Sequence, residues 1–257
     1  LDLGLEGAQG EVGEHGLEYL FGYLFKGADD TLVYEGDWAL TRADEKRGFE
    51  KFVDFVMARW AQFPSLHVYH YAPYEPAALK RLMGRYATRE EEIDRMLRAG
   101  LFVDLFQIVR RGLRASVESY SIKQLEPFYA FTRGTPLADA NAALANFQAH
   151  LELSDAPSIA DDIKATVRAY NEDDCRSAAS LRDWLEALRG KLIAEGIDVP
   201  RPQPGDGAPN EKVSDWLIRI NALIGRLTAD VPADPAERSD EQQARWILAN
   251  VLDWHRR

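Results

Sequence analysis

Hydrophobic residues at the start of the chain alternate with polar or small ones, which is the period of a β-strand. In residues 1–6 the odd positions are all leucine, and the even positions are Asp2, Gly4 and Glu6. A strand with this pattern turns its leucines toward a core and offers the even positions on its other face. The pattern therefore predicts a first strand that carries two acids on one face.

Two more strands are predicted after a glycine-rich loop at residues 7–16. Residues 17–25 (LEYLFGYLF) and 31–38 (TLVYEGDW) are rich in the aromatic and branched side chains typical of strands. Four aromatic residues of the first segment are expected to be mostly core, although one exposed near a site could stack a terminal base: Tyr19, Phe21, Tyr23 and Phe25. Three short strands in succession predict an antiparallel meander.

The spacing of apolar residues then changes to three or four, which indicates helices. Helices are predicted at residues 42–63, 73–83, 89–98, 105–113 and 121–128, and short strands at 66–71 and 101–105. Residues 132–157 are interpreted as a surface connection with a weak helix at 137–147, and a long amphipathic helix is predicted from Ser158. This order predicts an α/β fold in which a mixed sheet, an antiparallel meander followed by parallel strands, is flanked by helices.

A proline- and glycine-rich stretch at residues 200–209 (PRPQPGDGAP) indicates a linker. The predicted organisation is a main domain at residues 1–195, a linker at 196–211 and a C-terminal extension at 212–257 with helices at 213–227 and 241–255. Two helices alone bury little surface, so we expect them to dock on the main domain or on something downstream. The missing initiator methionine and the ending WHRR favour a piece of a longer polypeptide.

The net charge of −11 disfavours a broad binder of duplex phosphates, whose affinity comes largely from counterions released at lysine and arginine contacts. It is compatible with a nuclease, because metal-binding carboxylates belong to the acidic excess and bound cations offset them. No apolar run reaches the roughly 18 residues of a membrane span. The single cysteine, Cys175, excludes an internal disulfide framework and fits a reducing cytoplasm, so we expect a cytoplasmic protein without a membrane partner.

The long C-terminal helix carries a tyrosine and an acid four residues apart, Tyr170 and Asp174. On a helix this spacing puts both side chains on one face. The pair makes chemical sense if the carboxylate holds a metal ion and the phenol orients a water or a phosphate beside it. The alternative is a half-buried tyrosine beside a solvated aspartate.

Two other acids have apolar surroundings: Glu6 at the end of the first strand, and Glu75 at the start of a helix. These two acids and Asp174 are expected to converge on Mg²⁺ or Mn²⁺, because hard cations prefer oxygen ligands. Two ions about 3.5–4 Å apart would clamp the attacking water and the leaving 3′ oxygen. The scarcity of histidine and cysteine agrees with an all-oxygen site.

The acidic first strand and the segments HYAPYE, VDL, YSIKQLEPF and YNEDDC resemble the DEDD superfamily of 3′–5′ exonucleases on the RNase H-like fold. Within it, the chain resembles the YprB-like ribonuclease H domain over about residues 1–190. In bacteria that domain lies between a RecB-like nuclease and a superfamily 1 helicase in one polypeptide. The tail RWILANVLDWHRR is similar to the segment that leads toward the helicase.

The resemblance implies roles for individual residues. The third family motif, Y-x-x-x-D, matches Tyr170 and Asp174, with Tyr170 orienting the nucleophilic water. The second motif usually ends in an aromatic–Asp pair and here ends in Tyr74-Glu75. The first motif is D-x-E, and if Glu6 is its glutamate, the aspartate position is occupied by Gly4, which has no ligand.

Asp2 is the candidate replacement for the missing acid at Gly4. It shares a strand face with Glu6 but lies ~13 Å from it at ~3.3 Å per residue, where the motif spans ~6.6 Å. A bulge would shorten that span. We therefore expect metal ligands at Glu6, Glu75 and Asp174, with Asp2 as a fourth, in a site that binds two ions or only one.

The resemblance implies a metal-dependent 3′–5′ exonuclease that acts on single-stranded DNA or RNA ends, as one module of a larger DNA-processing protein. The alternative is a catalytically degenerate RNase H-like module, lacking the acid at Gly4, that binds nucleic acid or packs against nuclease and helicase neighbours. An ordinary hydrolase of small phosphoesters is a third possibility with no sequence feature of its own.

Other chemically capable residues have simpler interpretations. Asp104 is expected as an acid supporting the site or, equally, as a helix cap, and His70 as a packed or hydrogen-bonding histidine. Lys123 and Arg114 would suit phosphate contacts but are interpreted as solvated charges. Cys175 is interpreted as a small packing residue, because no partnered base accompanies it.

Overall fold

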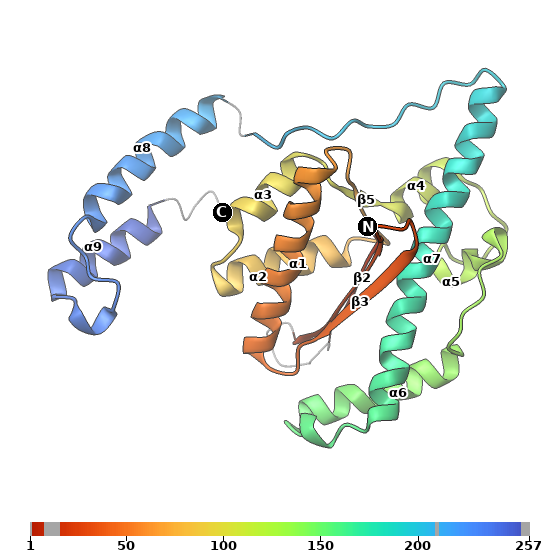
Figure 1. Cartoon of the computed structure of the whole chain (residues 1–257), viewed down its shortest axis with the longest axis horizontal. Coiled ribbons are helices and arrows are strands. Elements are labelled where there is room, and N and C mark those ends of the chain that lie inside the picture. Colours follow the sequence, from red (N-terminus) through yellow and green to blue (C-terminus); the bar gives the residue numbers. More distant parts are fainter. Residues whose placement is uncertain (1, 8–15, 209–210, 253–257) are drawn as a thin grey trace. The chain divides into compact units, whose positions relative to one another are not determined.

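The computed structural model contains one five-stranded sheet at its centre (Figure 1). The structure describes residues 2–7, 16–208 and 211–252, and describes side chains over residues 16–208 and 215–252. The strands are β1 (Asp2–Gly7), β2 (Glu18–Lys26), β3 (Leu32–Trp38), β4 (Val68–His70) and β5 (Phe102–Asp104). All five correspond to segments where the sequence predicts a strand.

The strand order is β3-β2-β1-β4-β5. The first three strands pair antiparallel, and β1, β4 and β5 run parallel to one another. An antiparallel meander is therefore extended at the β1 edge by two parallel strands, each reached through a helical crossover. The predicted fold class, an RNase H-like mixed sheet flanked by helices with a C-terminal helical part, is confirmed.

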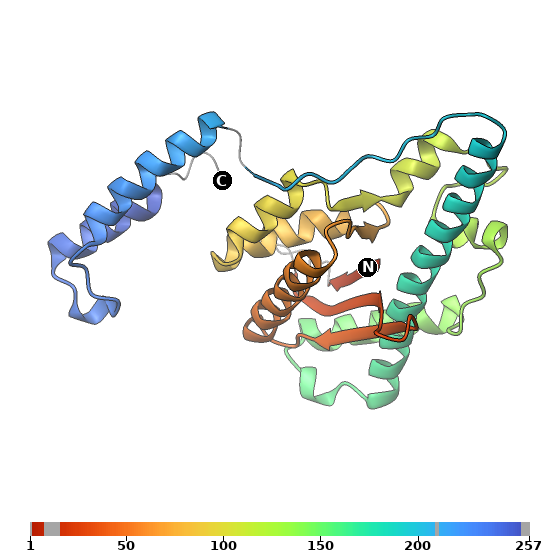
Figure 2. The same ribbon diagram turned by 45° about the horizontal axis from the view of Figure 1, so that its top comes forward.

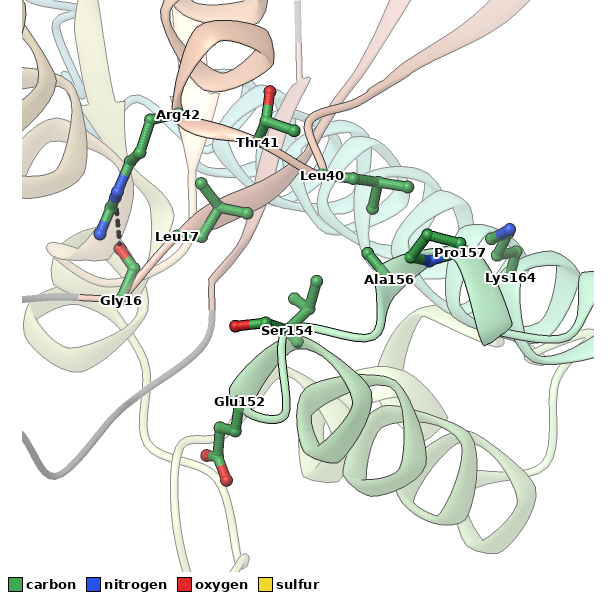
Figure 3. A pocket seen from close by; sticks show the side chains of 11 residues that line it. Gly16, Leu17, Leu40, Thr41, Arg42, Glu152, Ser154, Ala156, Pro157 and Lys164 are labelled. Carbon is green, nitrogen blue, oxygen red and sulfur yellow. Dashed lines mark hydrogen bonds between the residues drawn. The ribbon is translucent and has the colours of Figure 1, made fainter.

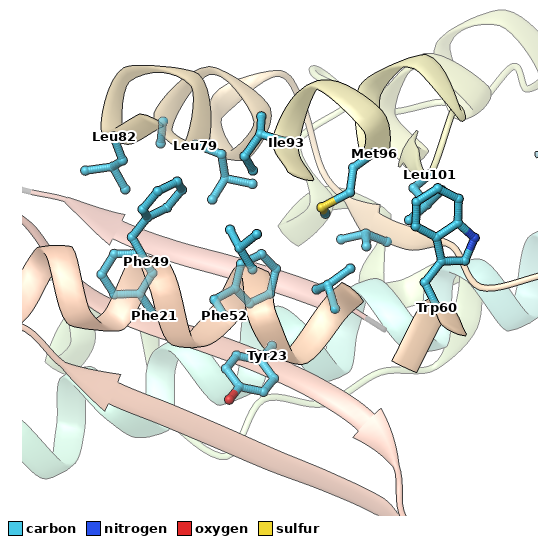
Figure 4. Packing of buried hydrophobic residues seen from close by; sticks show 14 of the residues in the cluster. Phe21, Tyr23, Phe49, Phe52, Trp60, Leu79, Leu82, Ile93, Met96 and Leu101 are labelled. Atoms are coloured by element: carbon cyan, nitrogen blue, oxygen red, sulfur yellow. The ribbon is translucent and has the colours of Figure 1, made fainter. Parts of the chain in front are cut away.

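Three helices cover one face of the sheet: α1 (Arg42–Gln62), α2 (Tyr74–Tyr86) and α3 (Glu90–Arg98) (Figures 1 and 2). Helix α1 begins where Thr41 and Asp44 form a reciprocal capping box. Its stripe of Phe49, Phe52 and Val56 packs with Phe21 and Tyr23 of β2 and with apolar residues of α2 and α3 (Figure 4). Helical spacing in the sequence thus produces the main core.

The opposite face is covered by α7 (Asp161–Ala194), with α6 (Leu137–Glu152) beside it (Figure 1). The shorter elements α4 (Leu105–Gly112), α5 (Ile122–Leu125), the 3-10 helix η1 (Glu126–Tyr129) and the 3-10 helix η2 (Ala156–Ser158) complete this part. Strand β2 is buried on both faces, because Phe21 and Tyr23 join the α1 core while Leu20 and Leu24 pack toward α6 and α7. The aromatic residues expected in the core are therefore found there, with Phe25 half-buried at the end of the strand.

The interpretation of residues 132–157 as a surface connection is wrong for α6. Phe147 of this helix is fully buried, with ring centroids 4.6 Å from Tyr19 and 5.2 Å from Trp38. Its alanine-rich sequence gives a weak apolar stripe, so the buried face of Phe147, Leu144 and Leu151 was not recognised.

The closest approach of α7 to the sheet falls at Gly22 in the middle of β2. A Cβ atom built on Gly22 would overlap the side-chain oxygen of Asn171 and lie 2.8 Å from the Tyr34 hydroxyl. Tyr34 in turn donates a hydrogen bond of 2.8 Å to that oxygen. Only glycine leaves room for this pair between the strand and the helix.

The residues after α7 run in extended conformation along the first compact unit, which comprises residues 1–207. Arg189 donates to the Val199 carbonyl at 2.7 Å, and Gly205 donates to the Ala99 carbonyl at 2.9 Å. The second unit, residues 208–257, contains α8 (Glu211–Thr228), the 3-10 helix η3 (Pro235–Glu237) and α9 (Asp240–Val251). The predicted boundaries at residues 195/196 and 211/212 stay a prediction.

The two long helices of the second unit pack against each other. Arg238 lies over the Trp246 ring at 4.6 Å, and Arg245 pairs with Asp230 at 2.9 Å. Several large apolar side chains of this unit are exposed: Ile218, Trp246, Ile247, Leu248 and Val251. Across the described part of the chain, none of the helices combines the length and the apolar character needed to cross a membrane.

Replacing Gly22 by alanine is expected to lower the free energy of unfolding by about 1–3 kcal/mol, because the added methyl group overpacks the Asn171 contact. Gly84 is the matched control: it lies inside α2 and a Cβ there meets nothing within 4 Å. Gly84→Ala should raise stability by about 0.5–1 kcal/mol through helix propensity alone. Urea unfolding of both variants checks the opposite signs, and a neutral Gly22→Ala would contradict this packing.

Candidate active site

The carboxyl ends of the parallel strands β1, β4 and β5 meet at one edge of the sheet, which is where open α/β sheets bind ligands. Glu75 is the second residue of α2, which follows β4 after a short loop. Asp104 ends β5. Register pairs His70 with Asp104, so these two strand ends are side by side.

Glu75 is buried, with 8% of its surface exposed. Its Oε2 atom lies 3.8 Å from His70 Nδ1. Nδ1 also lies 2.6 Å from the Ala72 carbonyl oxygen, which only accepts, so this nitrogen carries the proton. Burial lowers the pKa of His70 below its ordinary value, against the Ala72 bond and the Asp104 charge, so the imidazole is neutral at pH 7. His70 is thus the packed, hydrogen-bonding histidine that the sequence favoured.

Asp104 holds the loop between β4 and Glu75. Its Oδ1 atom accepts from Phe106 N at 2.9 Å, which caps α4, and from Ala72 N at 3.0 Å. Ala72 has φ of 68°, a conformation that costs a non-glycine residue about 1–3 kcal/mol and persists only where the surroundings fix it. The capping role expected for Asp104 is confirmed, and the same carboxylate fixes the chain that leads to Glu75.

A second buried acid, Glu18, fixes the first turn of α2. Tyr74, next to Glu75, donates a hydrogen bond of 2.8 Å to Glu18 Oε2, and Arg81 donates one of 2.5 Å to Oε1. The Glu18 amide in turn donates to buried Glu45 of α1 at 2.6 Å. The loop before Glu75 is therefore tied to β5 through Asp104, and helix α2 is tied to the start of β2 through Glu18.

Tyr170 and Asp174 lie one turn apart on α7, as predicted. Tyr170 is buried, with 6% of its surface exposed, while the Asp174 side chain keeps 27%. Two cations flank the Tyr170 ring: Lys123 Nζ lies 5.0 Å and Arg133 Cζ 5.5 Å from the ring centroid. Lys123 also donates a hydrogen bond of 2.5 Å to the Tyr170 hydroxyl.

Arg133 bridges two acids. Its Nη2 atom lies 2.6 Å from Asp174 Oδ1 and 2.6 Å from Glu126 Oε1. Ser177, on the next turn of α7, donates to the same Glu126 oxygen at 2.9 Å. Lys123 and Arg133 therefore balance the charges of Glu126 and Asp174 around Tyr170.

The charges in this cluster shift one another's pKa values. Burial raises the pKa of Asp174 above its ordinary value, although Arg133 and Lys123 act in the opposite direction. Burial also disfavours the charged form of Lys123, but the Tyr170 hydroxyl and Asp174 outweigh it, and the net pKa is raised. The pKa of Arg133 is raised as well, so Lys123 and Arg133 both stay protonated at neutral pH.

The acid next to Asp174 secures the loop that carries Arg133. Asp173 accepts from Gly134 N at 3.2 Å and from Thr135 N at 2.8 Å, and only 8% of its surface is exposed. Two consecutive acids of α7 thus bind the same loop. Asp173 accepts from the loop backbone, and Asp174 pairs with the Arg133 side chain.

The side chains of Asp2 and Glu6 lie outside the described residues, but the backbone of β1 is described. Gly4 is paired with Gly22 and Glu6 with Leu20, so the even positions of β1 fall in register with the β2 positions that face α7. Leu20 packs with Val167, and Gly22 faces Asn171. Gly4 is therefore at the level of Asn171, which stands between Tyr170 and Asp174 in the helix.

The described side chains contain two of the predicted metal ligands, Glu75 and Asp174. Within the part of the chain whose side chains are described, no three acidic, histidine or cysteine groups lie close enough to hold an ion. The described donors are carboxylate oxygens, which have the chemistry that Mg²⁺ and Mn²⁺ prefer. Any third ligand from the predicted set must come from β1.

Three residues of the cluster were missed by sequence reasoning. Lys123 was interpreted as a solvated charge, which is wrong, since it is half-buried against Tyr170. Glu126 lies in the same segment, YSIKQLEPF. The resemblance of this segment to the family was the available signal for both residues. Arg133 lies in a loop without any pattern that would single it out. Arg114 is exposed, and Cys175 packs in the core with Leu24, as expected.

A cavity of about 640 Å³ opens at the end of the sheet where β2 starts and β3 ends (Figure 3). Its apolar wall includes Leu17, Leu40 and Pro157, and its basic side chains are Arg42 and Lys164. Gly7, the last residue of β1, is paired with Glu18 at the start of β2, so the cavity is at the carboxyl edge of β1.

The strand order, the parallel extension of the meander and the helix that packs across β1 and β2 define an RNase H-like α/β domain. A family model described as the RNase H superfamily matches residues 8–186. The chain belongs to that superfamily. The match includes Glu75, Tyr170 and Asp174 and begins after β1. Comparison with the curated proteins and with the solved structures gave no significant match.

Glu18 should make the free energy of unfolding depend on pH. Burial raises the pKa of Glu18, and Tyr74 and Arg81 offset this only in part. The native protein therefore keeps this proton to a higher pH than the unfolded chain, and its free energy of unfolding should fall as pH rises from about 4.3, the ordinary glutamate value, through the raised pKa. Above that pKa the contribution should stay constant.

Glu18→Gln removes the titrating group, so the difference in unfolding free energy between wild type and variant should change with pH in that window. Urea unfolding at a series of pH values measures it. Exposed Glu195→Gln controls for the loss of one carboxylate. Curves for wild type and Glu18→Gln that run parallel from pH 4 upward would contradict the raised pKa.

Proposed function

We propose that the chain is a metal-dependent 3′–5′ exonuclease module of the tyrosine-type DEDD group, similar to the YprB-like ribonuclease H domain. Membership of the RNase H superfamily indicates a nuclease-type function. The observation that carries the finer proposal is the pair on α7, Tyr170 and Asp174, at the level of the β1 positions that face this helix. The spacing and the location both agree with the third motif of that group.

Glu75 and Asp174, with Glu6 and Asp2 from β1, are the residues that would hold Mg²⁺ or Mn²⁺, as two ions or one. When bound, such an ion would stabilise the negative charge that develops during phosphodiester hydrolysis. Tyr170 orients the attacking water with its hydroxyl group. The two cations beside it, Lys123 and Arg133, balance the charges of Glu126 and Asp174 around this hydroxyl group.

A strand end fits this site better than an extended duplex. The chain carries a net charge of −11, which opposes a long phosphate footprint. The cavity at the carboxyl edge of β1 offers an apolar wall and two basic side chains, a combination suited to an unstacked base and its phosphate. We therefore propose single-stranded 3′ ends of DNA or RNA as substrates, processed next to RecB-like nuclease and helicase domains of the same polypeptide.

Asp174→Asn tests the activity. The purified chain with Mn²⁺ should release nucleotides from a 3′-labelled single strand and shorten a 5′-labelled one stepwise, and the variant should be slower by at least about a hundredfold. Asp183→Asn is the matched control, on the same helix with a side chain that is 69% exposed. Equal rates for wild type and Asp174→Asn would contradict the proposal, as would cleavage of a circular single strand at the same rate.

The second candidate function is a degenerate nuclease module, and Gly4 is the observation that favours it. The family pattern has an aspartate at this position, and glycine offers no ligand. In this case the chain would bind a strand or pack against neighbouring domains without turnover.

Gly4→Asp separates the two functions. If the wild-type chain is degenerate, the new carboxylate should bring Mn²⁺ binding, measured by calorimetry, and a gain in turnover of about a hundredfold or more. Gly4→Ala adds a side chain without a ligand and should bring neither. A wild-type chain that already turns over at the rate of Gly4→Asp excludes degeneracy.

A further inference from the structure

Lys123 reaches the candidate site from a different element than the predicted acids. It lies in the first turn of α5, which Ser121 caps through the Gln124 amide. Its side chain crosses to α7, where Nζ lies 2.5 Å from the Tyr170 hydroxyl oxygen. Nζ is also 5.0 Å from the centroid of the Tyr170 ring.

The hydrogen-bonding capacities of the two groups fix the direction of this bond. A lysine ammonium has three donors and no acceptor, so the Tyr170 oxygen must accept. The phenolic proton then points away from Lys123. A tyrosine without this partner can rotate its hydroxyl group and act as donor or acceptor toward a neighbouring molecule.

We propose that Lys123 is a positioning residue that fixes the Tyr170 hydroxyl as a donor toward the attacking water. This inference rests on the proposed nuclease function. A water molecule that accepts from Tyr170 keeps a lone pair directed by that bond, so its orientation toward the phosphorus is set before attack. Lys123 acts on the reaction through Tyr170 and does not itself touch the substrate.

A purely structural role for Lys123 is the competing explanation. Other bonds already tie this region to α7: Tyr129 to Ser177 at 2.9 Å, Glu126 to Ser177, and Arg133 to Asp174. Because these remain, Lys123→Met should fold, and methionine keeps a side chain of similar length without the ammonium group. Lys123→Arg keeps a donor at a similar reach.

The test is a double-mutant cycle on the full chain with Mn²⁺ and a 3′-labelled single strand. Lys123→Met should lower kcat about 10–100-fold, a range typical of residues that orient a catalytic group, with KM unchanged within about twofold. Lys123→Arg should restore most of kcat. In a Tyr170→Phe background, Lys123→Met should have no further effect on kcat, because the group it positions is gone.

A spectroscopic readout without metal or substrate accompanies the kinetics. With ¹³Cζ-labelled tyrosine, the resonance lost in Tyr170→Phe identifies Tyr170, and this resonance should move in Lys123→Met. It should stay in place in Lys51→Met, which removes an exposed lysine paired with Asp37 on the other side of the sheet. An unmoved resonance would overturn the hydrogen bond itself.

The outcomes separate the two proposals. No metal-dependent activity in the wild type, with the Tyr170 resonance moving as expected, overturns the nuclease function and with it the catalytic role of Lys123. Activity that depends on Asp174 but survives Lys123→Met overturns the role of Lys123 alone. Equal losses from Lys123→Met with and without the Tyr170 hydroxyl would show a direct substrate contact and overturn positioning through Tyr170.

Discussion

The contact between Asn171 and Gly22 is the constraint on which the candidate site depends. Because β2 has no side chain at this point, α7 lies close against the sheet, with the Asn171 oxygen bound by Tyr34. Tyr170 and Asp174 flank Asn171 in the helix, so the same approach sets their distance from β1. A larger residue at position 22 would move the helix away from the sheet, and the two candidate side chains with it.

Much of the fold follows from local patterns in the sequence. Alternation predicts β1, and aromatic runs predict β2 and β3, because a strand buried on one or both faces leaves that signature. Helical spacing predicts α1 and most of α7, and the spacing of Tyr170 and Asp174 predicts their common face. The predicted meander orders β1 to β3, whereas the pairing of β4 with β1 and of β5 with β4 joins segments far apart in the chain, which local patterns do not encode.

Spacing along the sequence does not show the polar cluster around Tyr170, although two of its residues lie in the segment YSIKQLEPF. Lys123, Glu126 and Arg133 come from a short helix, a 3-10 helix and a loop, and their contacts with α7 span about forty to fifty residues of chain. A charged residue in a loop is usually solvated, and only tertiary packing reveals that it is not. The burial of Phe147 was missed for a related reason, since the few large apolar residues of an alanine-rich helix give only a weak periodicity.

The loop at residues 133–135 links the ionisation of Asp174 to the position of α6. Asp173 accepts hydrogen bonds from the backbone of this loop, and Arg133 of the loop pairs with Asp174. The loop continues directly into α6 at Leu137. If α6 moves away from the sheet, the Arg133 guanidinium leaves Asp174. The carboxyl group then loses a positive charge that lowers its pKa. The packing of α6 on the sheet is thereby coupled to the ion pair between Arg133 and Asp174.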